Sequence, residues 1–88
     1  MSLEESFNEC AERVKTALTK RPTNEELLQL YALYKQAAIG DNNTSKPGMM
    51  DVKGKYKWEA WNKKKGTSKE DAMKEYIKFV EYLISCYA

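Results

Sequence analysis

Residues 67–87 read TSKEDAMKEYIKFVEYLISCY. Apolar side chains recur in this stretch three and four positions apart, which places them on one face of an α-helix. The hydroxyl of Thr67 followed by the carboxylate of Glu70 predicts a capping box where the helix begins. An apolar face of this length must be covered by other helices, so the stretch predicts a helical domain. The face consists of Ala72, Met73, Tyr76, Phe79, Val80, Leu83, Ile84 and Tyr87.

Two further helical patterns precede this stretch, and Pro22 separates them. Ser2 with Glu5 predicts a capping box for the first helix, and Thr23 with Glu26 predicts one for the second. No segment alternates with the two-residue period of a half-buried strand. The apolar positions are Phe7, Cys10, Ala11, Val14, Ala17 and Leu18 in the first pattern, and Leu27, Leu28, Leu30, Tyr31, Leu33 and Tyr34 in the second.

The third helix has the weakest pattern of the four. It is expected from Asp51 to Lys65, with Trp58 and Trp61 as core anchors and Gly66 as its end. Residues 41–50 have the composition of a loop. The predicted fold is an all-α four-helix bundle, a single domain over residues 1–88 with a long loop between its second and third helices.

Composition excludes several kinds of chemistry. The chain has no histidine, the commonest general base and metal ligand, and we predict neither a catalytic residue nor a metal site. Cys10 and Cys86 are expected to be unpaired and buried. The N-terminus is acidic and no apolar run reaches the roughly 18 residues of a membrane span, so we expect a cytoplasmic protein without stable membrane anchoring. A monomer is the default expectation.

Positive charge is concentrated in one region. The formal net charge is +2, yet residues 46–69 hold eight lysines against Asp51 and Glu59. Such a region is usually a solvated face, but it also favours binding of a polyanion. One hypothesis is therefore a basic surface module that binds anionic membrane or nucleic acid through residues 46–69.

Two patches of rings and ammonium groups are expected on the second and third helices. Tyr31, Tyr34 and Lys35 share one helix face, and Lys53 shares another with Lys57. Together they could clasp an aromatic ring that carries phosphates. The pattern leaves open whether Tyr76 lies in the core or in this site.

Five separated blocks of the sequence resemble the acyl-CoA-binding protein family, and the resemblance extends from Phe7 to Tyr87. It implies an up-down-down-up bundle that binds medium- to long-chain acyl-CoA esters one to one. It also implies an intracellular carrier and pool former that is not an enzyme, needs no cofactor, binds no nucleic acid and makes at most transient membrane contact. The blocks are Tyr31-Ala32-Leu33-Tyr34-Lys35-Gln36-Ala37, Gly40-Asp41, Pro47-Gly48-Met49, Lys55 to Asn62 and Lys65 to Ala72.

The resemblance also implies a ligand site. Tyr31, Tyr34 and Lys35 would receive the adenine ring and the ribose 3′-phosphate, which Lys57 would close over. Thr16 to Arg21 is one residue longer than is usual in the family, so the place of Lys15 depends on the register of the first helix. The full set of implied ligand-binding residues is Lys15, Tyr31, Ala32, Leu33, Tyr34, Lys35, Lys53, Lys57 and Tyr76.

The acyl chain needs an apolar groove, because each buried methylene contributes about 0.8 kcal/mol. Leu27, Leu28 and Leu30 could line it together with Met49 or Met50, since methionine repacks easily around chains of different length. Tyr56 stands where the family commonly has a small residue. It is interpreted as a surface substitution that could add a ring at the rim.

Overall fold

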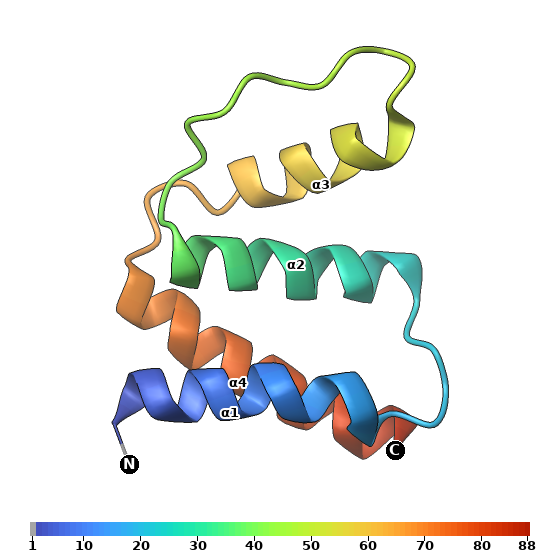
Figure 1. The fold of residues 1–88 in the computed structure, drawn as a ribbon, viewed down its shortest axis with the longest axis vertical. Coiled ribbons are helices and arrows are strands. Elements are labelled where there is room, and N and C mark those ends of the chain that lie inside the picture. Colours follow the sequence, from blue (N-terminus) through green and yellow to red (C-terminus); the bar gives the residue numbers. More distant parts are fainter. Residues whose placement is uncertain (1) are drawn as a thin grey trace.

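The computed structural model describes residues 2–88 and contains only helices and connections over that range. The helices are α1 (Leu3–Ala17), α2 (Asn24–Ala38), α3 (Val52–Asn62) and α4 (Lys69–Tyr87). In Figure 1, α1 and α4 run in one direction, whereas α2 and α3 run in the other. The all-α four-helix prediction is confirmed.

Two of the three predicted capping boxes are confirmed. Ser2 with Glu5 and Thr23 with Glu26 each form reciprocal bonds between side chain and backbone. The third prediction is wrong, because Ser68 rather than Thr67 is the N-cap of α4 and accepts a hydrogen bond from the Asp71 N–H at 3.1 Å. The carbonyl of Thr67 instead accepts a hydrogen bond from the side chain of Gln36 at 2.7 Å, and Thr67 therefore belongs to the connection that precedes α4.

Helix α3 is shorter than predicted. It ends at Asn62, after which the backbone N–H groups of Lys64 and Lys65 donate to carbonyls three residues earlier, so the chain forms turns. The turns lead to Gly66, whose φ of +94° suits glycine. Gly40, with φ of +103°, follows the end of α2 as expected.

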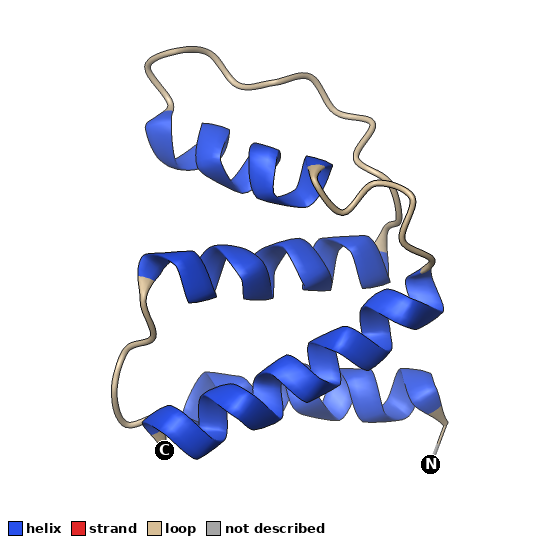
Figure 2. Ribbon diagram, turned by 180° about the vertical axis from the view of Figure 1, so that it is seen from behind, coloured by secondary structure: helices blue, strands red, loops and turns tan. Residues whose placement is uncertain are grey.

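Helix α2 connects two layers of the molecule. It packs against α4 on one side and α3 on the other, and α4 also packs against α1. Figures 1 and 2 show α3 separated by α2 from the α1 and α4 layer. Among the described helices, α3 therefore has only α2 as a packing partner. The main cluster of buried residues joins α1, α2 and α4 and consists of Phe7, Cys10, Leu33, Ala37, Ala72, Tyr76 and Val80.

Three aromatic rings fasten α1, α2 and α4 together. The ring centroid of Phe7 lies 5.5 Å from that of Tyr34 and 5.0 Å from that of Tyr76, and the two tyrosine rings are 5.9 Å apart. Tyr76 is only 3% exposed, so its ring belongs to the core. These separations lie within the favourable range for ring pairs.

Polar bonds to the long loop supplement the packing of α3. Trp61 is buried as predicted, and its Nε1–H donates to the Gly40 carbonyl at 2.9 Å. Trp58 is only half-buried, contrary to expectation, since its Nε1–H donates at 2.9 Å to the Thr44 carbonyl in the loop. Asn42 is buried and donates to the Trp58 carbonyl. The loop therefore forms part of the support for α3.

Hydrogen bonds join helices and connections at both ends of the bundle. At one end, the fully buried Gln36 donates to Asp41 and Thr67, and Asp41 also accepts from the Gly66 N–H. The bond from Gly66, followed by that from Gln36, lowers the pKa of Asp41. At the other end, Tyr87 accepts bonds at its carbonyl from residues 19–20, and its hydroxyl donates to Glu26.

Burial of Tyr76 predicts a loss of stability in alkali. Desolvation raises the pKa of Tyr76 to about 12, above its ordinary value of 10.0. Ionisation therefore favours the unfolded chain, and the stabilisation present below pH 10 is lost as pH rises towards 12. Denaturant unfolding at a series of pH values should show this fall. Tyr76→Phe should make it shallower without abolishing it, because the hydrogen bond to Glu26 also raises the pKa of Tyr87 to about 12. An equally steep fall in Tyr76→Phe would contradict the assignment; Tyr56→Phe, which removes an exposed hydroxyl, is the control.

The two cysteines should differ in reactivity. Both are unpaired as expected, but Cys86 is exposed where burial was predicted, because it lies on the solvent side of the last turn of α4. Cys10 is buried, and desolvation raises the pKa of its thiol. A chromogenic disulfide reagent should modify Cys86 rapidly and Cys10 only after denaturation. Equal rates in the native protein, or loss of the fast phase in Cys10→Ser rather than Cys86→Ser, would refute this arrangement.

Candidate ligand-binding grooves

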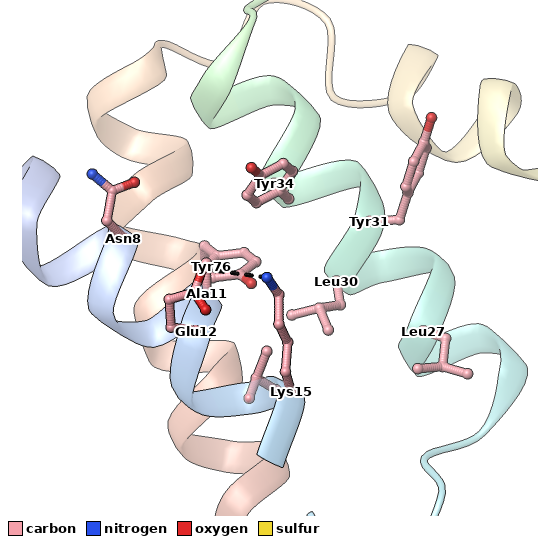
Figure 3. A pocket seen from close by; sticks show the side chains of 10 residues that line it. Asn8, Ala11, Glu12, Lys15, Leu27, Leu30, Tyr31, Tyr34 and Tyr76 are labelled. Atoms are coloured by element: carbon pink, nitrogen blue, oxygen red, sulfur yellow. Dashed lines mark hydrogen bonds and ion pairs between the residues drawn. The ribbon is translucent and has the colours of Figure 1, made fainter. Parts of the chain in front are cut away.

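A first groove of about 460 Å³ lies where α1 and α2 diverge over α4. Figure 3 shows Tyr34 and Tyr76 in this space, with Lys15 reaching in from α1 and Leu27 and Leu30 projecting from α2. The walls are therefore mostly apolar or aromatic, with one charged rim. The full lining is Asn8, Ala11, Glu12, Val14, Lys15, Leu27, Leu30, Tyr31, Tyr34 and Tyr76.

A second groove of about 740 Å³ lies between α2 and α3. Leu27 and Tyr31 line both grooves, so the two spaces adjoin along one edge of α2. These residues are four positions apart and therefore lie on one helix face. The second groove is lined by Arg21, Asn24, Glu25, Leu27, Leu28, Tyr31, Val52, Lys53, Tyr56 and Lys57.

Two ammonium groups from different helices lie beside the ring of Tyr31. The Nζ atom of Lys57 on α3 is 5.4 Å from the ring centroid, and that of Lys35 on α2 is 5.8 Å away. Neither lysine forms an ion pair with a described carboxylate. The two positive charges at this junction are therefore available to an anion.

The structure brings together most of the residues predicted for the site. Lys15, Tyr31, Tyr34 and Tyr76 line the first groove, whereas Lys53 and Lys57 join Tyr31 in the second. Lys35 reaches the same ring from one turn further along α2. The ammonium of Lys15 pairs with Glu12 at 3.2 Å on the rim of the first groove. Leu27 and Leu28 line the second groove, whereas Leu30 lines the first and not the second.

Three predicted residues lie elsewhere. Ala32 and Leu33 are 0% and 1% exposed, because they occupy the buried side of α2, and neither lines a groove. Met49 is 88% exposed at the end of the loop and also lines neither groove, like its neighbour Met50 at 97%.

Sequence reasoning missed part of each wall. Asn8, Ala11 and Glu12 in the first groove share a helix face with Lys15, so their spacing from that lysine is the signal that could have identified them. Val52 and Tyr56 in the second groove belong to a helix without a clear apolar face. Only the packing of α3 on α2 reveals their position.

The described residues contain no group of three or more histidine, cysteine or acidic side chains arranged to hold a metal ion. Within the same part of the chain, no helix has the length and apolar character needed to cross a bilayer.

Comparisons with known proteins give one consistent result. The model of the family described as "Acyl CoA binding protein" matches residues 4–80. The chain is 64% identical over 84 residues to an acyl-CoA-binding protein homolog of Drosophila melanogaster, and the alignment covers 96% of each chain. It is 55% identical over 82 residues to the acyl-CoA-binding protein of Saccharomyces cerevisiae, covering 93% of each.

The fold leads to the same group. The crystal structure of Oryza sativa acyl-CoA-binding protein 2 superposes with a TM-score of 0.90 at 47% identity, covering 94% of this chain and 89% of that one. Sequence and structure therefore agree over almost the whole length, and the chain belongs to the acyl-CoA-binding protein family.

Proposed function

We propose that this protein binds one long-chain acyl-CoA ester and carries it without chemical change. The observation that supports this most strongly is the junction at Tyr31, where two grooves meet beside the ammonium groups of Lys35 and Lys57. A ligand with an aromatic ring, phosphates and a long apolar chain matches the three parts of that arrangement.

The first groove suits the adenine ring. Tyr31, Tyr34 and Tyr76 supply aromatic surfaces around a space of about 460 Å³. A flat ring gains from such surfaces by offset or edge-on packing. Lys15 and Glu12 on the rim supply polar groups that can orient the exocyclic amine and ring nitrogens. The nucleotide would thus enter between α1 and α2.

The 3′-phosphate would lie between Lys35 and Lys57. Their ammonium groups flank the same ring at 5.8 Å and 5.4 Å, so an anion at this point can interact with both charges at once. No proton transfer is required. Binding of the anion would also draw α2 and α3 together, because each helix supplies one of the two lysines.

The second groove would hold the acyl chain. It is larger than the first groove, and Leu27, Leu28 and Val52 give it apolar lining. The stems of Lys53 and Lys57 can cover methylenes while their charged ends remain in water. The predicted contribution of Met49 would require the end of the loop to close over the chain, and it stays a prediction.

We do not propose catalysis. The chain lacks histidine, burial raises the pKa of the Cys10 thiol, and Cys86 lines neither groove. The hypothesis of a basic module for membrane or nucleic acid gains no support from the comparisons, which match a family named for another ligand. A cytoplasmic location and a monomeric state remain predictions.

Calorimetry with three ligands tests the proposal. Long-chain acyl-CoA should bind one to one, CoA should bind more weakly, and 3′-dephospho-CoA should bind more weakly still. The first difference reflects burial of methylenes and the second reflects loss of the dianion between two lysines. Equal affinity for CoA and its dephospho form would refute the phosphate site. No heat or competition with long-chain acyl-CoA would refute the carrier.

Substitution of Lys57 tests the junction. Lys57→Ala should weaken binding of CoA by about 10- to 100-fold, since a charge-assisted hydrogen bond contributes about 1.5–3 kcal/mol. Its effect on 3′-dephospho-CoA should be much smaller. Lys55→Ala removes the same charge from the same helix at a position that lines neither groove, and it serves as the control. Equal losses in the two variants would show that only the general positive field matters.

A further inference from the structure

A third groove lies beside the second on the pair formed by α2 and α3. It measures about 280 Å³. Glu25, Leu28 and Tyr56 line both it and the second groove, so these three residues form the border between them. The rest of its lining consists of Gln29, Glu59, Ala60, Lys63 and Lys64.

Tyr56 has the largest side chain of the three border residues, and its hydroxyl and ring make few contacts with the rest of the protein. It is 56% exposed, and within the described residues its hydroxyl forms no hydrogen bond and its ring packs on no other aromatic ring. Leu28, in contrast, is partly buried on α2. The ring of Tyr56 therefore contributes to the walls of the grooves rather than to the core.

We infer that Tyr56 limits the length of acyl chain that the second groove accommodates, an inference that rests on the function proposed above. A chain that leaves the junction at Tyr31 follows Leu27 and Leu28 along α2 and meets the border at Tyr56. The phenol ring separates it from the third groove. Without the ring, the two grooves form one longer path.

The third groove can receive the end of such a chain. Leu28 and Ala60 provide apolar surface, and the stems of Lys63 and Lys64 can cover additional methylenes. Each buried methylene raises affinity by about four-fold. Methylenes that extend beyond the border in the wild type remain in water and add little, so affinity should rise with chain length and then level off.

The test measures affinity by calorimetry for saturated acyl-CoA esters of about 8 to about 22 carbons. The wild type, Tyr56→Ala and Tyr56→Phe are compared. In Tyr56→Ala the rise should continue for at least about two more methylenes, so that the longest esters bind about ten-fold more tightly than to the wild type. Tyr56→Phe keeps the ring and should level off with the wild type. The midpoint of thermal unfolding, measured for all three proteins without ligand, serves as the control for folding.

Three results would overturn the inference. If Tyr56→Ala and the wild type level off at the same length, Tyr56 sets no limit. A uniform loss of affinity at every length would make Tyr56 an ordinary contact. Absence of wild-type binding to any ester would refute the carrier itself, and that result differs from the other two, in which the wild type still binds.

Discussion

The position of α2 between two layers is the constraint on which the rest of the structure depends. One side of this helix packs against α4 through residues such as Leu33 and Ala37, and the other packs against α3. Leu27 and Tyr31 are left along an edge that neither partner covers, and this edge borders both grooves. The same packing that buries the core therefore forms both grooves.

The two sides of α2 are stabilised by different interactions. On the α4 side, the rings of Phe7, Tyr34 and Tyr76 and the aliphatic core supply apolar burial. On the α3 side, the indole N–H groups of Trp58 and Trp61 donate hydrogen bonds to the carbonyls of Thr44 and Gly40, which add to the packing of the helices. The ammonium of Lys57 on α3 lies 5.4 Å from the centroid of the Tyr31 ring, and this lysine is exposed rather than part of the core.

Much of the fold could be predicted from the sequence, because strong local signals coincide with the helices. The pairs Ser2 with Glu5 and Thr23 with Glu26 mark real helix starts. The predicted capping box at Thr67 was wrong, because the Thr67 carbonyl accepts a hydrogen bond from the side-chain amide of Gln36, a residue far away in sequence. The end of α3 was also missed, because the turns after Asn62 depend on backbone bonds that composition does not reveal.

The positions of the candidate site residues were predictable where charge or ring chemistry is unusual and unpredictable where they depend on packing. Tyr31, Lys35 and Lys57 could be singled out from spacing and resemblance, and the structure brings them together. Ala32 is buried and Met49 is exposed because of how α2 and the loop pack in the folded protein. The sequence alone does not reveal that packing. Tyr56 is exposed, as expected of a surface substitution, but its place between two grooves follows only from the packing of α3 on α2.

The central claim is that one ligand occupies both grooves and the junction between them. Titration of the isotope-labelled protein with a long-chain acyl-CoA, followed by amide NMR, tests it most directly. Residues from α1, α2 and α3 that line the first and second grooves should shift together and stop shifting at one equivalent. Shifts confined to residues 46–69, or shifts that continue to grow without saturation, would contradict the claim and indicate a non-specific basic surface.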